Sequence, residues 1–205
     1  MISINIQEPK IQELPFSYSP GMFLSEKAFN EHLKLYKGYV DKSNAIYEAL
    51  QTNPERKDAN KTQSHYRCLK KGETFALGGV VLHEMYFRNI DKAGQDVPKP
   101  GPEFAALAES SFGSFYNWIE DFRACAKGAR GWCAACYEQR TGTLRNILSD
   151  AHDEGFSMTM YPILVIDMYE HAYYMDFGTD AAKYIEKFLE QVNWQVVEER
   201  AAKIR

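Results

Sequence analysis

One stretch near the end of the chain constrains the fold more than any other, because it joins a buried strand to two possible metal ligands. Residues 161–166 form an apolar, β-branched run, which predicts a buried strand. Asp167 ends that run and His171 follows four residues later. A carboxylate oxygen beside an imidazole nitrogen suits iron, manganese or zinc. By itself the spacing is more typical of a capped strand end with a hydrogen-bonded histidine, so the rest of the chain must test the metal site.

Composition limits the possible classes of protein. The chain has 205 residues with 45% hydrophobic and 25% charged residues, which is typical of a globular protein. Its formal charge of −4 argues against a nucleic-acid partner, which usually selects a basic surface. No apolar run is long enough to cross a membrane, so we expect no membrane partner. The first residues lack a basic region followed by an apolar core, so we predict no secretory signal and a cytoplasmic location.

The four cysteines are too few for a disulfide scaffold in a chain of this size. Cys133 and Cys136 have the spacing of a redox or zinc pair. Their surroundings read as a strand, whereas a thioredoxin-like pair opens a helix. We therefore interpret both as small buried thiols.

The first half of the chain predicts two long helices. Ser25 can cap a helix that runs to about residue 50, with apolar residues at three- and four-residue spacing. Residues 51–63 read as a loop, and residues 73–90 are apolar around most of a second, buried helix. Within that helix, Gly78 and Gly79 would let another backbone approach closely.

The second half predicts a mixed domain after a Pro/Gly-rich linker at residues 91–102. We expect helices at 104–110 and 111–122, then strands at 132–137, 144–149 and 161–166, with a hairpin turn at 140–143. Two more helices begin near Thr179 or Asp180 and at Asn193. The fold class is therefore α+β: an N-terminal domain of two long helices at 1–92, and a C-terminal α/β domain with a three-stranded antiparallel sheet at 102–205.

Two further histidines lie where they can complete a metal site. His32 is on the apolar face of the first long helix, and His83 is on the buried helix. Either histidine alone would more often be a hydrogen-bonded core residue. Together with Asp167 and His171 they would provide the four donors that a redox metal needs.

Several segments resemble the iron/manganese superoxide dismutases, in the same order along the chain. Residues 167–174 differ at one position from the family signature Asp-x-Trp-Glu-His-Ala-Tyr-Tyr, because Tyr169 replaces the tryptophan. The other matching segments are Leu24–His32, Gly78–Phe87, Phe112–Phe115, Gly131–Trp132 and Val192–Trp194.

The resemblance implies a superoxide dismutase, which converts superoxide anion to O₂ and H₂O₂. It also implies one Fe or Mn ion per subunit, bound by His32, His83, Asp167 and His171. Glu170 in that family reaches the partner subunit's ligand histidine, which implies a homodimer, possibly a tetramer.

Further residues of the site follow from the same resemblance. Trp132 matches a tryptophan that lines the active site, and Tyr174 can hydrogen-bond the ligands from outside. The family's active-site tyrosine aligns with Val40, so Tyr39, through a one-residue deletion, or Tyr36 takes that role.

The resemblance also implies a residue, usually Gln in the family, that hydrogen-bonds the solvent at the metal. In family members with Gly four residues before the second histidine, as Gly79 is here, that residue comes from the loop after the second strand. We assign His152 to this role, with Asp153 as the alternative. An exposed loop histidine is an equally good interpretation of His152, and we expect His65 on the surface without a role.

Several departures from the family keep a second function open. Leu82, Phe87, Ala134 and Tyr169 replace an asparagine or aromatic residues of the family pattern. These losses slightly favour a metal-binding protein of the same fold with low or no dismutase activity. A metal-assisted hydrolase would need a general base beside a zinc-bound water, and no motif requires one.

Overall fold

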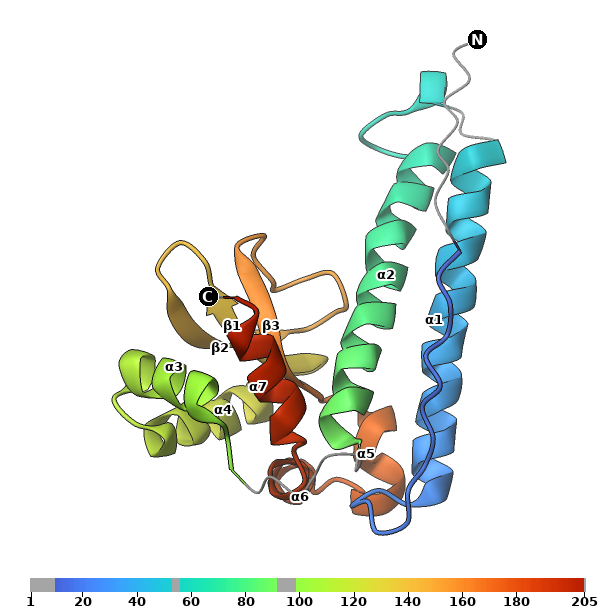
Figure 1. Ribbon diagram of the computed structural model, residues 1–205. Coiled ribbons are helices and arrows are strands. Elements are labelled where there is room, and N and C mark those ends of the chain that lie inside the picture. Colours follow the sequence, from blue (N-terminus) through green and yellow to red (C-terminus); the bar gives the residue numbers. More distant parts are fainter. Residues whose placement is uncertain (1–9, 53–55, 92–98, 205) are drawn as a thin grey trace.

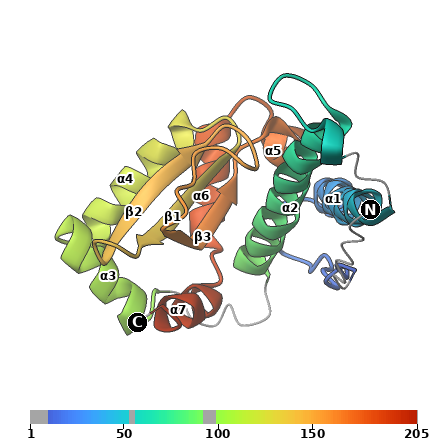
Figure 2. The same cartoon turned by 90° about the horizontal axis from the view of Figure 1, so that it is seen from above.

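The computed structural model describes residues 10–52, 56–91 and 99–204, and shows two long antiparallel helices beside a small sheet flanked by helices (Figure 1). The long helices are α1 (Glu26–Thr52) and α2 (His65–Ile90), joined across a short 3-10 turn at Arg56–Asp58. Figure 2, seen from above, shows α2 between α1 and the sheet. The predicted fold class is confirmed.

Helix α1 begins where the sequence predicts, because the backbone N–H of Ala28 donates to Ser25 Oγ at 3.2 Å. Its buried face repeats at helical spacing and packs along α2. These buried residues are Ala28, Phe29, His32, Tyr36, Val40, Ser43, Ile46 and Leu50.

Helix α2 begins eight residues earlier than the periodicity predicted. Ser64 caps it by accepting a hydrogen bond from the backbone N–H of Arg67 at 3.2 Å. The added turns are mostly polar and exposed, so they carry no apolar stripe that would reveal a helix. The predicted loop at 51–63 is in part helical, and its residues 53–55 lie outside the described residues.

The predicted linker at 91–102 falls largely on residues 92–98, which lie outside the described residues. Helix α3 (Pro102–Phe112) follows, and Gly113 ends it in a left-handed conformation with φ of 80°. Ser114 then caps α4 (Phe115–Gly128), so the predicted helix at 111–122 begins later than its apolar pattern suggested.

The sheet is antiparallel, with strand order β2-β1-β3, as predicted. Its strands are β1 (Trp132–Glu138), β2 (Thr143–Ser149) and β3 (Met160–Asp167). Trp132 pairs with Ser149 on one side and with Asp167 on the other. The start of β1 and the ends of β2 and β3 therefore meet at one edge of the sheet.

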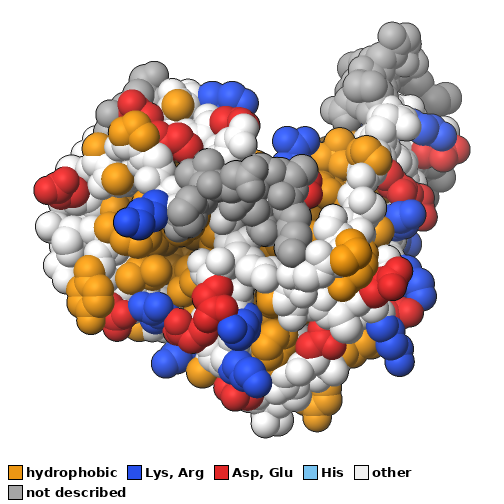
Figure 3. Space-filling model, turned by 60° about the horizontal axis from the view of Figure 1, so that its bottom comes forward, with side chains coloured by type: hydrophobic (Ala, Val, Ile, Leu, Met, Phe, Trp, Pro, Cys, Tyr) orange, Lys and Arg blue, Asp and Glu red, His pale blue; other side chains and the backbone are white. Residues whose placement is uncertain are grey.

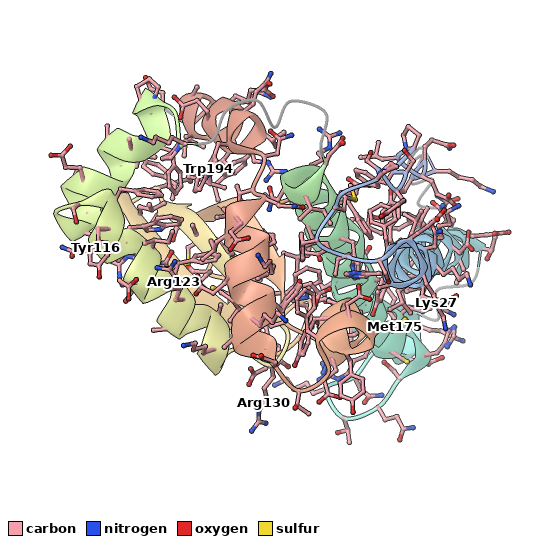
Figure 4. All side chains as sticks on the ribbon, turned by 90° about the horizontal axis from the view of Figure 1, so that it is seen from below. Lys27, Tyr116, Arg123, Arg130, Met175 and Trp194 are labelled. Carbon is pink, nitrogen blue, oxygen red and sulfur yellow. The ribbon has the colours of Figure 1, made fainter. Side chains whose placement is uncertain are left out.

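Three helices complete the chain. The sequence did not predict α5 (Glu170–Phe177), since only Ala172 and Tyr173 of it are buried and no apolar stripe marks it. The predicted caps Asp180 and Asn193 begin α6 (Ala181–Glu190) and α7 (Trp194–Ala202). Figure 4 labels Arg123 on α4, whose guanidinium binds the carboxylate of Glu186 on α6 at 2.8 Å.

The main cluster of buried side chains extends through both halves of the chain. It includes Phe29 and Phe87 of the long helices as well as Trp118, Trp132 and Phe188 of the second half. None of the helices in the described part of the chain is both long and apolar enough to cross a membrane.

Candidate metal centre

The site forms where one edge of the sheet meets the two long helices. Asp167 is the last residue of β3, and the strand register places it opposite Trp132. Helices α1 and α2 pack on each other and α2 packs on β3, so their apolar faces direct His32 and His83 toward that edge. Helix α5 starts directly after β3 and returns His171 to Asp167 at a spacing of four residues.

The three imidazoles converge on a single carboxylate oxygen. Asp167 Oδ2 lies 3.1 Å from His32 Nε2, 3.7 Å from His83 Nε2 and 3.4 Å from His171 Nε2. One ligand atom from each of the four residues lies within 4.8 Å of the others. The predicted ligand residues are therefore brought together as one cluster able to bind one metal ion.

The Asp167 carboxylate is oriented by its second oxygen, which accepts the backbone N–H of Tyr169 at 2.9 Å. Burial raises the pKa of Asp167, but hydrogen bonds from His171 and His32 outweigh it and hold the pKa well below its usual range. The carboxyl is therefore an anion, the form that binds a cation.

His83 is held in the tautomer that a metal ligand needs. Its Nδ1 lies 2.6 Å from the backbone oxygen of Gly79, so Nδ1 carries the proton and donates it there. Burial, together with the neighbouring His32, lowers the pKa of His83 to about 3, so the ring is neutral. His83 Nε2 is buried without a protein partner, and burial also lowers the pKa of His32. Two neutral imidazoles beside a carboxylate, with the Nε2 of His83 free of any hydrogen bond, fit a divalent or trivalent transition metal.

His152 is buried beside this cluster, with 4% of its surface exposed, instead of lying on the surface. Trp132 Nε1 donates to His152 Nδ1 at 2.9 Å, and His152 Nε2 lies 2.7 Å from the hydroxyl oxygen of Tyr39. Because Trp132 can only donate, His152 Nδ1 accepts and the imidazole proton is on Nε2. Both ring nitrogens of His152 are therefore engaged.

The two candidate tyrosines have different surroundings. The Tyr39 ring lies 5.3 Å from the His83 ring, and its hydroxyl meets His152. The Tyr36 hydroxyl instead donates to Glu84 at 2.9 Å and accepts the backbone N–H of Leu14 at 2.8 Å. The structure thus places Tyr39 at the cluster and Tyr36 in a separate network between α1, α2 and the N-terminal segment.

The remaining predicted residues lie at the outer side of the cluster or away from it. Glu170 and Tyr174 are exposed on α5, and Tyr174 is 53% exposed. Asp153 accepts a hydrogen bond from Thr74 Oγ1 at 3.1 Å, an exposed contact. His65 is exposed at the start of α2, as expected.

Tyr169 and Phe87, which replace tryptophans of the family pattern, still make ring contacts with ligand histidines. The sequence alone did not indicate these contacts. The Tyr169 ring stacks on His171 with centroids 5.3 Å apart and planes at 13°. The Phe87 ring lies 5.1 Å from His32. Phe75, which the sequence analysis missed, meets His152 edge to face at 4.6 Å. The Phe75 side chain is 40% exposed, so Phe75 does not belong to the buried apolar face by which the sequence identified helix α2.

Comparison with known proteins identifies the family to which the chain belongs. Residues 100–200 match the C-terminal domain of the iron/manganese superoxide dismutases. The chain is 38% identical to a superoxide dismutase [Fe] of Aquifex pyrophilus over 180 residues, which cover 87% of this chain and 82% of the relative. It belongs to the iron/manganese superoxide dismutase family.

Superoxide dismutases of both metals are among its relatives. Superoxide dismutase [Mn] 1 of Halobacterium salinarum is 33% identical over 95% of this chain and 96% of its own length. Superoxide dismutase [Fe] of Pyrobaculum aerophilum is 30% identical over 93% and 90%. The similarity thus covers both long helices as well as the matched C-terminal domain, and it does not select one metal.

Proposed function

We propose that the chain is a superoxide dismutase that works with one Fe or Mn ion held by His32, His83, Asp167 and His171. The observation that carries this proposal is the convergence of three imidazole Nε2 atoms on Asp167 Oδ2 at a buried sheet edge. When bound, iron or manganese supplies a one-electron couple, by which two superoxide anions and two protons become O₂ and H₂O₂.

The chain's own residues fix the charge of the site. Of these ligands, His32 and His83 are neutral rings and Asp167 is an anion at neutral pH. Phe87 and Tyr86, both buried, pack against the His32 ring and exclude water from that side.

We assign proton transfer to the hydrogen-bonded series of side chains that runs from Trp132 through His152 to Tyr39. His152 Nε2–H donates to the Tyr39 oxygen, so the Tyr39 hydroxyl hydrogen is free to donate to a reactant. Burial raises the pKa of Tyr39, which keeps that hydrogen in place at neutral pH. We keep His152, rather than Asp153, as the residue that tunes the reacting solvent, and in this arrangement it acts through Tyr39.

We also propose a homodimer through α5. The side chain of the ligand His171 is 33% exposed, and Tyr174 and Met175 beside it are 53% and 55% exposed. Figure 3 shows hydrophobic side chains at the surface on the underside, where α5 lies, and Figure 4 labels Met175 there. A second copy over this surface would shield His171 and place Glu170 near the partner's site. Light scattering that gives a monomer with full activity would refute it.

One purified sample tests the enzyme proposal. Metal content should approach one Fe or Mn ion per chain, and the same sample should remove superoxide in a dismutase assay. A fully loaded protein without activity, tested with each metal in turn, would instead support the metal-binding alternative. The domain division at 1–92 and 102–205 and the cytoplasmic location stay predictions.

A further inference from the structure

Three of the four thiols gather between α4 and β1, away from the residues of the metal centre. Cys125 lies on α4, and Cys133 and Cys136 lie on β1, which α4 covers. The three influence one another electrostatically. Cys68, by contrast, is exposed on α2.

The geometry brings one pair into contact. The Cys133 sulfur lies 3.9 Å from the backbone oxygen of Phe122, against the helical turn that precedes Cys125. Side chains of a helix lean toward its N-terminus, so Cys125 can reach that same turn. The Cys125 and Cys133 thiols interact through their side chains, which makes the two sulfurs neighbours across the α4–β1 contact.

The neighbouring pair on the strand does not have this geometry. Cys133 and Cys136 are three residues apart in a strand, which separates their Cα atoms by about 10 Å at a rise of about 3.3 Å per residue. A disulfide needs Cα atoms within about 7 Å. The strand geometry therefore excludes a Cys133–Cys136 disulfide and leaves Cys125, whose thiol interacts with that of Cys133, as the candidate partner.

The two thiols also differ in the way that a reactive pair requires. Cys125 is partly exposed, and a hydrogen bond from the Cys133 thiol lowers its pKa despite partial burial. Cys133 is fully buried, and burial raises its pKa. The accessible thiol is thus the better nucleophile, and the buried thiol is protected from direct oxidation.

We propose that Cys125 and Cys133 form a reversible disulfide when the protein meets hydrogen peroxide. The Cys125 thiolate attacks one peroxide oxygen, the O–O bond breaks, and the other oxygen leaves as hydroxide, which takes up a proton as water. Cys133 sulfur then attacks the resulting sulfenic acid at Cys125, the S–O bond breaks, and a second water leaves with the Cys133 proton. The sulfurs lose two electrons and one peroxide is reduced to two waters. The source of peroxide in this account is the dismutase reaction, so that part rests on the proposed function.

The test uses the metal-loaded full chain with Cys68→Ser, which removes the exposed thiol that could join two chains. Titration with added hydrogen peroxide should reduce the alkylatable thiols, counted after denaturation, from three to one per chain. Peptide mapping should find residues 125 and 133 joined, and dithiothreitol should restore all three thiols.

Two variants separate this pair from its neighbour. Cys125→Ser should prevent the disulfide, whereas Cys136→Ala should leave it unchanged. Cys125 is only partly buried, so its replacement by serine leaves the core intact, and a circular dichroism spectrum checks the fold. Peroxide-treated protein with three free thiols, with a 133–136 link, or with sulfinic acid at Cys125 and a free Cys133 would overturn the proposal. Because peroxide is added, the disulfide can form in a protein without dismutase activity, and the two proposals fail separately.

Discussion

The two ends of the α1–α2 hairpin are made from the same pair of helices but differ in what packs on them. At the ligand end, Phe29, Tyr36 and Phe87 belong to the main core, which continues into the sheet. At the far end, a separate small cluster holds Ile46, Leu50 and Ala76 between the two helices, and the N-terminal segment adds hydrogen bonds between Ile11 and Asn44. The far end also has an open hollow of about 480 Å³, lined mainly by polar and basic residues around residues 59–74.

The glycines show how closely the buried side of the ligand end is packed. A Cβ at Gly78 would clash with the backbone oxygen of His152, and one at Gly79 would lie 2.7 Å from the Tyr39 ring. A Cβ at Gly38, on the exposed side of α1, would meet nothing within 4 Å. The ligand end is therefore fixed by close contacts between α1, α2 and the loop after β2. At the far end, the small cluster holds the two antiparallel helices against each other.

The largest effect should come from Asp167→Asn, which removes the charge on which the three imidazoles converge at almost constant volume. We expect the loss of most of the bound metal and of the activity, because a ligand is lost outright. Elemental analysis of the purified variant measures this. Asp153→Asn is the matched control, since that carboxylate binds the exposed Thr74. A variant that still carries one ion per chain would show that the cluster is not the metal site.

His152→Ala should keep the metal and lower turnover about 10- to 100-fold, because Tyr39 loses the donor that orients its hydroxyl. The pH profile of turnover should shift, and His152→Gln should recover part of the rate. His65→Ala, at the exposed start of α2, provides the matched change at the far end and should alter neither metal content nor rate. An unchanged rate in His152→Ala would transfer the role to another residue.

A truncation at each end compares their packing directly. Phe87→Ala should lower the free energy of unfolding by about 3–5 kcal/mol, and Leu50→Ala by about 2 kcal/mol. Phe87 is enclosed by rings from several segments, whereas the two-helix end around Leu50 can relax into the gap. Urea unfolding of the metal-free proteins gives both values, because bound metal would add its own stabilisation. Equal losses would show that the far end is packed as tightly as the ligand end.

The pH dependence of stability should be largest at the ligand end. Burial and His32 lower the pKa of folded His83 to about 3, whereas the unfolded value is about 6.5. Between these values the unfolded chain binds the extra proton, so stability falls as pH decreases below about 6.5, by up to about 1.4 kcal/mol per pH unit. Urea midpoints of the metal-free protein between pH 7 and 4.5 test this. His83→Gln cannot titrate and should reduce the slope.

The sequence predicted the ligand end better than its surroundings, for physical reasons. His32, His83, Asp167 and His171 lie on regular elements whose periodicity and order along the chain were readable. The start of α2 and the whole of α5 were not, since both are largely exposed and lack an apolar stripe. The choice between Tyr36 and Tyr39 depended on how α1 is rotated about its axis, because this rotation decides which hydroxyl reaches the site. Residue spacing alone does not give that rotation. The burial of His152 depended on a loop that packs on Gly78, a contact between residues far apart in the chain.

The smallest effects should come from the glycines, and they should differ in sign. Gly38→Ala should raise the free energy of unfolding by about 0.5–1 kcal/mol, because alanine favours the helix and the added methyl group meets no atom. Gly79→Ala makes the same gain in helix propensity but pushes a methyl group into the Tyr39 ring, at a cost of about 1–3 kcal/mol for the overpacking. Urea unfolding of the metal-free variants measures both, and a dismutase assay on the loaded variants should show lower turnover for Gly79→Ala alone. If Gly79→Ala were also stabilising with full activity, the Tyr39 ring would have room to move, and the buried side of the ligand end would be no more tightly packed than its exposed side.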